Sequence, residues 1–555
     1  MRPTIRFTAT VMAFALTGLA SNAMAQTPAP DVDLDAVFAA VAPTGPGCAV
    51  GLARPGQPVL RGARGMADLE HPDPLTPTTI FESGSVAKQF TAAAVLLLVQ
   101  DGKLGLDDDI RLYLPEMPDY GTPITLRHLL THTSGLREQW SLLALTGNPP
   151  GTQVHSQAVI LDLASRQKGL NFAPGAEFLY TNTNYSLAAI IVARVSGQSL
   201  QAFTDQRLFK PLGMGQTRWR EDFRTVVPGR ATAYAPVEDG FIASMPFTNV
   251  IGNGGLLTTL DDLLRWNAFL DRPAGLPGGA QLVAAMATPG RLTDGTVTPY
   301  GLGLELDRAH GLPRVGHSGS TGGYKTWTAR YPDAGISVAV LCNNGGINPV
   351  AVGEALADQA LAAAGRSVEE PIVPAPAASV PAAASADLAS YQGLFRNPVT
   401  GELLRTALLD GRLTLTQGRS QDLTPLGGER FRRADGDGVR FVRNGQGPAE
   451  LILSRDAKET RYPAVQPPLA EIGAYAGTYY SVELDAGIVV VRQGEALVIR
   501  QAFGVEWPLT PRFADGFSTP LRGVTTFVFT RAADGQVDGL RAWAGGARDI
   551  AFVRQ

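Results

Sequence analysis

The chain is poor in cysteine and nearly balanced in charge. Only Cys48 and Cys342 occur among its 555 residues, 47 Lys and Arg face 51 Asp and Glu, and the formal net charge is -4. This balance gives no overall basic surface, so nucleic acid is not expected as a partner. No His lies near either cysteine, which argues against zinc. Both cysteines lie in apolar, strand-like runs, so we expect two buried free thiols, although an oxidising compartment would permit a disulfide.

Long hydrophobic runs are missing beyond the N-terminus, and no later segment is long and apolar enough to cross a bilayer. The N-terminus has the pattern of an export signal. Arg2 and Arg6 supply positive charge, residues 7–19 are largely apolar, and residues 23–25 are Ala-Met-Ala. We predict that a signal peptide over 1–25 is removed, rather than kept as an anchor, and that the mature protein is periplasmic or secreted.

Motifs for several other chemistries are missing. There is no G-x-S-x-G segment, so the common α/β-hydrolase fold is disfavoured. His128 and His132 are four apart, as in the zinc motif H-E-x-x-H, but no Glu lies between them to act as a base. The Gly-Asn-Gly-Gly segment at 252–255 has its third glycine misplaced for a dinucleotide loop, and we expect it to allow a close backbone approach near the site. The sequence predicts no metal and no cofactor.

A stretch of unusual composition divides the chain. From Pro371 to Ala386 nearly every residue is Ala, Pro, Ser or Val, which is typical of an extended, semi-rigid linker. We place this linker at 367–386, after a mixed α/β domain over 26–366. In that domain the apolar patterns predict a buried strand and three helices: 336–341 for the strand, and helices from about Ser85 to Asp101, from Thr125 through Leu130, and after a cap at Thr258 or Thr259.

The C-terminal part contains a weak internal repeat. Residues 388–395 (LASYQGLF) resemble residues 472–479 (IGAYAGTY), and each copy is followed by alternating strand patterns with polar turns. Two units of this size suggest two small antiparallel β-barrels, over 387–467 and 468–555. Asp435 and Asp437 fit a plain turn, because no spaced set of further oxygen ligands for calcium follows them.

The strongest local signal for chemistry is Ser85-Val86-Ala87-Lys88. Residues three apart on a helix lie on the same side, so the Ser85 hydroxyl and the Lys88 amine come within reach of each other. The positive dipole end of the helix disfavours a charged Lys88 and should lower its pKa. A nearby neutral amine can take the proton of a serine hydroxyl, which acyl transfer requires. Taken alone, however, the tetrapeptide fits an N-cap serine and a surface lysine better than it fits a catalytic pair.

Two further segments supply complementary groups. Tyr180 offers a phenol that can relay a proton, and Asn182 offers an amide that can bind a substrate carbonyl or steady the lysine. In a later strand-like segment, Gly319 would let a substrate backbone lie close. The N–H of Ser320 would join that of Ser85 in an oxyanion hole. Singly, each of these residues also fits an ordinary loop or strand.

Together the segments resemble a known family, that of class C β-lactamases, D-alanyl-D-alanine carboxypeptidases, D-aminopeptidases and related esterases. The resemblance runs from about Leu34 to Ala363 and rests on seven segments in the right order: FESGSVAKQFTAAAVLLL, ITLRHLLTHTSGL, FAPGAEFLYTNTNYSLA, LFKPLGMGQT, GNGGLLTTLDDLLRW, YGLGL and GHSGSTGGY. It places the nucleophile on Ser85, the lysine on Lys88, the Tyr-x-Asn pair on Tyr180 and Asn182, and the third motif on His317 and Gly319. With Ser320 from the oxyanion-hole argument, we expect catalytic roles for Ser85, Lys88 and Tyr180 and substrate binding by Asn182, His317, Gly319 and Ser320.

His317 stands where many members of this family have lysine. Lysine is normally a cation that can hold a substrate carboxylate, whereas histidine is largely neutral near pH 7. The resemblance therefore points to the His-x-Gly branch, which includes D-aminopeptidases and esterases. We predict a serine peptidase that acts on short or D-amino-acid peptides. An esterase, a weak β-lactamase and a catalytically inert peptidoglycan-binding protein are the alternatives, and the acid–base set argues against the inert one.

The resemblance also implies an architecture. It implies an α/β (α+β) catalytic domain of the β-lactamase/transpeptidase type, with an antiparallel sheet flanked by helices. The D-aminopeptidases of the family carry two β-barrels of the lipocalin-like kind after this domain, and one barrel loop reaches the active site. The expected partner is a small peptide, amide or ester substrate, and the oligomeric state is left open.

Overall fold

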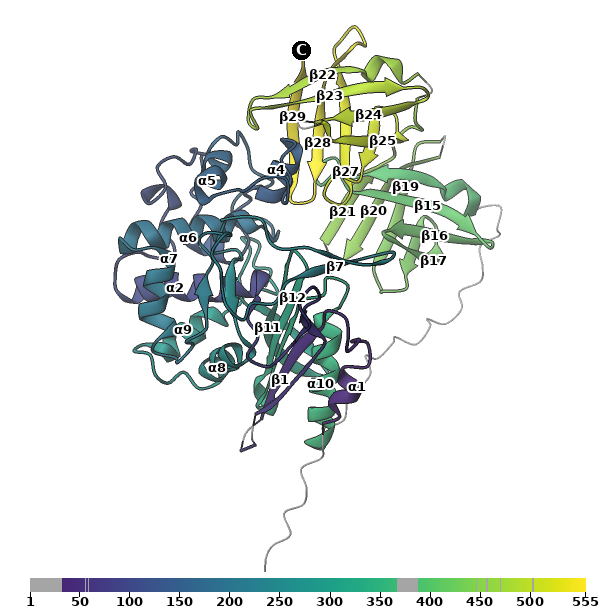
Figure 1. Cartoon of the computed structure of the whole chain (residues 1–555). Coiled ribbons are helices and arrows are strands. Elements are labelled where there is room, and N and C mark those ends of the chain that lie inside the picture. The colour runs from purple at the N-terminus through teal and green to yellow at the C-terminus, as the bar shows by residue number, and fades with distance from the viewer. Residues whose placement is uncertain are drawn as a thin grey trace, which may run out of the picture.

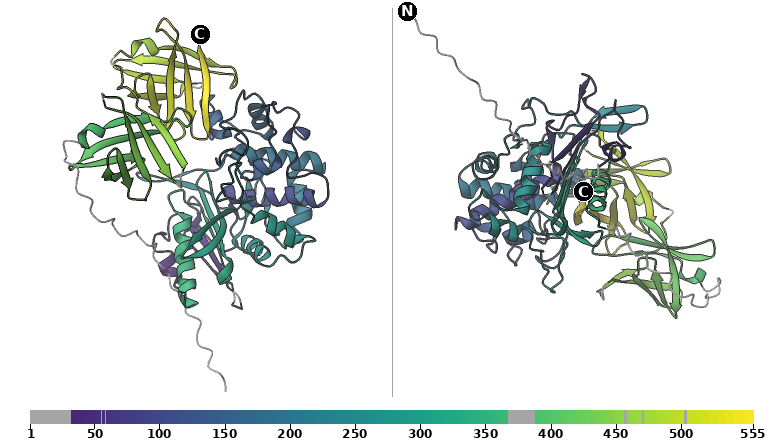
Figure 2. Two further views of the ribbon diagram at one scale, coloured as in Figure 1. Left: turned by 180° about the vertical axis from the view of Figure 1, so that it is seen from behind. Right: turned by 90° about the horizontal axis from the view of Figure 1, so that it is seen from below.

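A computed structural model describes residues 32–54, 56–57, 59–366, 388–445, 447–455, 458–469, 471–501 and 504–555. The predicted signal peptide at 1–25 and the predicted linker at 367–386 lie outside these residues. Figure 1 shows a mixed sheet-and-helix domain followed by two units built of strands, and Figure 2 shows the same arrangement from two further sides. In the described residues no helix has the length and apolar character needed to span a membrane.

The first domain is built on a six-stranded antiparallel sheet with the order β10-β11-β12-β13-β1-β2. Its strands are β1 (Cys48–Ala53), β2 (Leu60–Arg64), β10 (Glu305–Ala309), β11 (Leu312–Thr321), β12 (Tyr324–Tyr331) and β13 (Ile336–Cys342). The strand predicted at 336–341 is β13. All its residues are buried, because β12 and β1 pair with its two edges and helices cover both of its faces.

Helices cover both faces of this sheet, because side chains alternate between the faces along a strand. Val50 and Val340 pack with α1 (Leu34–Val37) and α10 (Pro349–Ala363) on one face. Ala49 and Ala339 pack on the other face with α8 (Leu260–Asp271). The result is an antiparallel sheet flanked by helices, which confirms the predicted fold class.

The helical part of the domain lies beyond α8 and holds the segment with Ser85. Its helices are α2 (Lys88–Gln100), α3 (Leu126–Leu130), α4 (Gln139–Leu145), α5 (Gln157–Ser165), α6 (Asn182–Ser196), α7 (Leu200–Thr204) and α9 (Gly279–Met286), with short helical turns η1 (Gly84–Ala87), η2 (Ile110–Leu112), η3 (Asp205–Phe209) and η4 (Pro332–Ala334). The short strands are β3 (Met66–Asp68), β4 (Asp73–Pro74), β5 (Phe81–Glu82), β6 (Arg218–Trp219), β7 (Tyr234–Val237), β8 (Gly240–Ala243) and β9 (Leu256–Thr258). The caps predicted at Thr125 and Thr259 are present: each hydroxyl accepts the backbone N–H of the third residue after it.

The two cysteines form a disulfide, so the expectation of two buried free thiols is wrong. Cys48 and Cys342 face each other directly across β1 and β13, on the side of the sheet that packs with α10. Their apolar surroundings made free thiols plausible. No local feature of either segment indicates that two stretches 294 residues apart become neighbouring strands.

Both C-terminal units are eight-stranded and antiparallel. The first has the order β14 to β21, and a hydrogen bond from Val465 N to Leu394 O nearly closes it; the second is a closed barrel. The first comprises β14 (Gly393–Arg396), β15 (Leu403–Leu409), β16 (Arg412–Gln417), β17 (Arg419–Gly427), β18 (Arg430–Arg433), β19 (Gly438–Arg443), β20 (Pro448–Arg455) and β21 (Lys458–Pro463). The second comprises β22 (Gly477–Ser481), β23 (Ala486–Gln493), β24 (Ala496–Arg500), β25 (Glu506–Phe513), β26 (Gly516–Thr519), β27 (Thr525–Arg531), β28 (Val537–Ala544) and β29 (Ala547–Arg554).

The sequence repeat corresponds to a structural repeat. Each copy begins with a 3-10 turn, η5 (Ala389–Tyr391) or η6 (Gly473–Tyr475), whose tyrosine is buried in the barrel core. The prediction of two antiparallel barrels is therefore confirmed. The exact domain boundaries, 26–366, 387–467 and 468–555, stay predictions.

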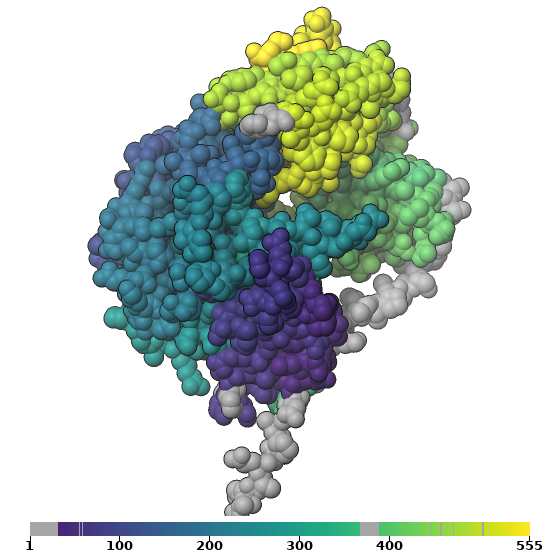
Figure 3. Space-filling view, viewed as in Figure 1, coloured from purple at the N-terminus to yellow at the C-terminus, as the bar shows by residue number. Residues whose placement is uncertain are grey.

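The second barrel packs against the helical part of the first domain (Figure 3). Gln501 Nε2 donates to the carbonyl of Ala144 in α4 at 2.9 Å, and Arg137 forms a buried ion pair with Glu483. The first barrel contacts the second, where Trp543 Nε1 donates to Val399 O at 3.1 Å. The second barrel thus lies beside the segment that follows α3, close to the candidate site.

Candidate active site

Ser85 lies in the 3-10 turn η1, directly before α2. Gly84 makes this turn possible, because its φ of +52° lies in the left-handed region. A Cβ on Gly84 would lie 2.5 Å from Ser320 N, and one on Gly319 would lie 3.2 Å from Ser85 N. Strand β11 therefore runs directly alongside η1, and the backbone N–H groups of Ser85 and Ser320 belong to two segments in contact. This contact is compatible with the oxyanion hole predicted from the sequence.

Lys88 is fully buried and makes three hydrogen bonds. Its Nζ lies 2.9 Å from Ser85 Oγ, 2.9 Å from Asn182 Oδ1 and 2.8 Å from the carbonyl oxygen of Asn253. The amide oxygen and the carbonyl oxygen can only accept hydrogen bonds. A neutral lysine has two N–H groups, and these donate to Asn182 Oδ1 and Asn253 O. The nitrogen lone pair therefore faces the Ser85 hydroxyl.

Burial sets the protonation states of the two candidate bases. It lowers the pKa of Lys88 to about 7, although the charges of Glu138 and Glu305 raise it in part. Burial raises the pKa of Tyr180 far above its usual range, and a hydrogen bond to Ser85 opposes this only partly. Near neutral pH, Lys88 therefore exists partly as a free amine, whereas Tyr180 keeps its phenolic proton.

Asn182 begins α6, with Thr181 as the N-cap, and its side chain connects Lys88 to Glu138. Asn182 Nδ2 donates to Glu138 Oε1 at 2.9 Å, and the other carboxylate oxygen accepts from Ser141 N at 2.9 Å. The backbone N–H of Glu138 donates to Gly546 O in the second barrel. The loop of the second barrel that contains Gly546 is thus connected to Lys88 through Glu138 and Asn182.

His317 lies in β11, and its side chain is 1% exposed. Its Nδ1 lies 2.5 Å from Ser318 O, a pure acceptor, so Nδ1 carries the proton and Nε2 accepts from Tyr300 Oη at 2.7 Å. Burial lowers the pKa of His317, and the charge of Glu305 opposes this only in part, so the ring is neutral at pH 7. Its ring centroid lies 6.1 Å from that of Tyr180. The structure therefore places His317 beside Tyr180. Its binding of substrate stays a prediction, as does that of Asn182, Gly319 and Ser320.

A cavity of about 500 Å³ opens in front of these groups. Ser85, Asn182 and Ser320 line it, together with Asn253 and, from the second barrel, Arg522. Lys88 and His317 lie behind this lining in the protein interior, and Tyr180, next to them, is partly exposed. The sequence-predicted residues are thus gathered in one place, with Ser85 at the cavity and the amine of Lys88 buried beneath it.

Comparison with known proteins agrees with this arrangement. A profile of the Beta-lactamase family matches residues 37–363 of the chain. The chain belongs to the Beta-lactamase family. The D-aminopeptidase of Brucella ovis is 29% identical over 534 residues, which cover 92% of this chain and 96% of that enzyme. The resemblance stated from the sequence is confirmed, and the chain is a serine hydrolase.

Two solved structures share the fold of this Beta-lactamase family member. A D-stereospecific amidohydrolase from Streptomyces sp. has a TM-score of 0.51 and 25% identity, and the match covers 59% of this chain and 98% of that one. An octameric penicillin-binding protein homologue from Pyrococcus abyssi has a TM-score of 0.54 and 22% identity, with 77% and 98% covered. The second likeness concerns the fold alone.

Two segments whose motifs resemble a zinc site and a dinucleotide loop, at His128 to His132 and at 252–255, have other roles in the structure. The helix α3 ends at Leu130, so His132 does not share a helix face with His128. His132 has φ +57°, and its Nδ1 accepts from Thr181 N at 3.2 Å, which positions the segment of Tyr180. The 252–255 segment approaches the site closely, as expected, because Asn253 O binds Lys88.

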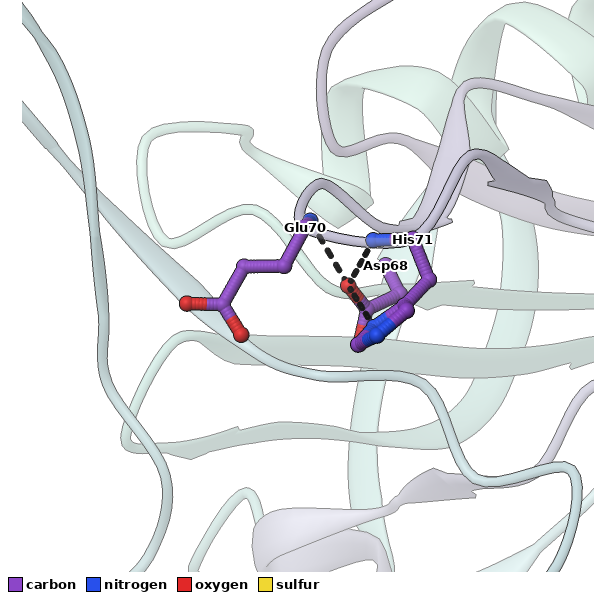
Figure 4. Close-up of side chains that lie close together, drawn as sticks. All are labelled: Asp68, Glu70 and His71. Carbon is purple, nitrogen blue, oxygen red and sulfur yellow. Dashed lines mark hydrogen bonds and ion pairs between the residues drawn. The ribbon is translucent and has the colours of Figure 1, made fainter.

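One group of three side chains among the described residues has the spacing of metal ligands: Asp68, Glu70 and His71 (Figure 4). Asp68 Oδ1 accepts the backbone N–H groups of Glu70 at 2.7 Å and His71 at 2.9 Å. This is the hydrogen bonding of an ordinary Asx turn, and His71 and Glu70 are exposed.

Sequence reasoning missed three contributors to the site: Glu138, Tyr300 and Arg522. Glu138 lies two residues beyond the family-like segment ITLRHLLTHTSGL, so extending that segment would have drawn attention to it. Tyr300 begins the segment YGLGL, which was recognised only as part of the resemblance. For Arg522 there was no local signal, because it reaches the cavity from another domain.

Proposed function

We propose that the protein hydrolyses short peptides or amides of D-amino acids through an acyl-enzyme on Ser85. The observation that carries this proposal is the buried Lys88, whose nitrogen lone pair faces Ser85 Oγ at 2.9 Å and whose pKa is lowered to about 7. A serine positioned beside a neutral amine is an activated nucleophile.

In the first half of the reaction, Lys88 takes the proton of Ser85 as Ser85 Oγ attacks the substrate carbonyl. The negative oxygen of the tetrahedral intermediate rests on the N–H groups of Ser85 and Ser320. The proton then passes from Lys88 to the leaving nitrogen through the protonated phenol of Tyr180, and the C–N bond breaks. Tyr180 suits this relay, because burial keeps its pKa high and its hydroxyl protonated.

In the second half, water releases the acyl group. Lys88, again neutral, takes a proton from the water with the help of Tyr180, and the water oxygen attacks the ester carbonyl. Collapse of the second tetrahedral intermediate returns the proton to Ser85 Oγ. Asn182 keeps Lys88 in place during both halves through the 2.9 Å hydrogen bond.

The choice of D-amino acid substrates is supported by the relatives named above. The Brucella ovis enzyme is a D-aminopeptidase that aligns over both barrels as well as the catalytic domain, and the Streptomyces enzyme is a D-stereospecific amidohydrolase. Penicillins are less well supported, because the neutral, buried His317 stands where a lysine would hold their carboxylate.

The test uses D-alanine p-nitroanilide and L-alanine p-nitroanilide, with p-nitrophenyl acetate and nitrocefin as further substrates. We expect hydrolysis of the D-anilide, a marked preference over the L-anilide, and covalent labelling by a fluorophosphonate probe. Ser85→Ala should abolish turnover and labelling. Ser83→Ala is the control, because Ser83 lies two residues before Ser85 and its buried hydroxyl has no hydrogen-bond partner among the described residues. Equal labelling of Ser85→Ala and wild type would refute the nucleophile, and preference for the L-anilide would refute the substrate class.

The proposal includes export by a signal peptide over 1–25 and a periplasmic or secreted location. The disulfide between Cys48 and Cys342 supports it, because disulfides persist in oxidising compartments. Expression of the full chain in a Gram-negative host, followed by fractionation and intact-mass measurement, should give a mature protein that begins at Gln26. Ala25→Arg should block this cleavage, since small residues are required there. A cytosolic protein that keeps residues 1–25 would contradict export.

A further inference from the structure

The charges around the cavity are unevenly distributed. Glu82 and Arg522 are the charged residues that line it in the described part of the chain. Glu82 is buried, and its carboxylate accepts from Arg220 at 2.8 and 3.1 Å and from Arg230 at 3.0 Å. These two guanidinium groups neutralise Glu82, so the cavity offers no free carboxylate for a substrate ammonium group.

Arg522 is the remaining charge. It lies between β26 and β27 of the second barrel, and its side chain is 40% exposed. Arg522 Nε forms a long ion pair with Glu138 Oε2 at 4.0 Å, a distance too great for a hydrogen bond. Both oxygens of Glu138 already accept hydrogen bonds, from Asn182 and Ser141. The donors of the Arg522 guanidinium therefore have no acceptor among the described residues.

A second cation, Lys325, lies next to a residue of the cavity lining. Lys325 in β12 donates from Nζ to Ser320 Oγ at 2.9 Å, and Ser320 lines the cavity. The wall that carries Ser320 is thus also positive. A cavity lined by Arg522, with Lys325 next to its lining and no unpaired carboxylate among its described lining residues, favours a negatively charged ligand.

We propose that the cavity binds substrates that carry a carboxylate, and that Arg522 of the second barrel determines this specificity. The guanidinium group is planar and suits a two-point contact with a carboxylate. Because Arg522 belongs to the second barrel, docking of that barrel supplies a positive charge for the carboxylate. The neutral His317 does not supply one. The inference rests on the proposed function, since it names which D-amino acid substrates the site accepts.

Two substrate pairs locate the carboxylate. D-alanyl-D-alanine and its C-terminal amide test a terminal carboxylate, whereas D-glutamate p-nitroanilide and D-glutamine p-nitroanilide test a side-chain carboxylate. In at least one pair, we expect wild type to have the higher kcat/KM for the acidic member. Arg522→Gln should reduce this preference by about 10- to 100-fold, the range for a hydrogen bond to a charged group, mainly through KM. Arg522→Lys should keep part of the preference, because the charge remains.

Arg512→Gln is the matched control, because Arg512 is an exposed arginine of the same barrel that does not line the cavity. It should leave every kcat/KM unchanged. If wild type hydrolyses the neutral members of both pairs better, or if Arg522→Gln lowers both members of each pair equally, the inference is refuted and the proposed function stands. If wild type hydrolyses no D-amino acid amide of either kind, the proposed function itself fails.

Discussion

Glu138 determines which way the amide of Asn182 faces. The carboxylate only accepts hydrogen bonds, so the Asn182 nitrogen lies toward Glu138 at 2.9 Å and the Asn182 oxygen toward Lys88. That oxygen takes one of the two N–H groups of a neutral Lys88, and Asn253 O takes the other. The free lone pair on the lysine is therefore aimed at Ser85 by a carboxylate that does not touch Ser85.

The first prediction concerns the pH dependence of catalysis. The rate should rise with pH through about 7, because Lys88 acts as a base only when neutral. The charge of Glu138 raises the pKa of Lys88, so Glu138→Gln should move this rise in kcat/KM to lower pH. Glutamine still offers an oxygen to Asn182, which limits the loss of orientation. The measurement is kcat/KM for D-alanine p-nitroanilide between pH 5 and 9.

Glu305→Gln is the control for this shift. Glu305 also raises the pKa of Lys88, but by less than Glu138, and it makes no hydrogen bond to Asn182. It should move the profile in the same direction by a smaller amount. A shift of the Glu138→Gln profile to higher pH would show that Lys88 is not the group that titrates.

Much of the site was predictable because its local parts depend on short-range sequence. The turn with Ser85 and Lys88 depends on Gly84 and the adjoining apolar helix, and Thr125 caps its helix as expected. The repeat at 388–395 and 472–479 gave the two barrels for the same reason. These features are encoded within single segments of the chain.

The remainder depends on contacts between distant segments. Cys48 meets Cys342 only because β1 pairs with β13, the strand of this sheet that comes last along the chain. Arg522 reaches the cavity only because the second barrel docks on α4. No periodicity in one sequence encodes such pairings.

The second prediction concerns Gly84. In Gly84→Ala, the residue would be strained at φ +52°, and its Cβ would meet the backbone nitrogen of Ser320 at 2.5 Å. Strand β11 must move away from η1, which should lower kcat by about 100-fold, as expected when reacting groups are misplaced by about 1 Å. Gly121→Ala is the control, since Gly121 has φ +78° but open space around the added Cβ. It should lose about 1 kcal/mol of stability and keep its activity. Equal activity of the two variants would contradict the close contact.

The third prediction concerns the disulfide. Thiol titration of the denatured protein should find no free thiol before reduction and two after it, because Cys48 and Cys342 are the only cysteines of the chain. Their replacement by alanine in a double variant should destabilise the catalytic domain by about 2–4 kcal/mol. Reductant should lower the melting temperature of wild type but not that of the double variant. Two free thiols in the unreduced protein would contradict the pairing.

The fourth prediction concerns the buried ion pair that joins the second barrel to the catalytic domain. The side chains of Arg137 and Glu483 are 6% and 8% exposed, so Glu483→Ala would leave a buried guanidinium without its partner. We expect a loss of about 3–5 kcal/mol, seen in thermal unfolding, together with weaker kcat/KM, because the same barrel carries Arg522. Arg541→Ala is the matched control: its ion pair with Asp549 is exposed on the same barrel and should contribute at most about 1 kcal/mol. If both variants lost the same small amount, the docking of the barrel would have to depend on its apolar contacts with α4 instead.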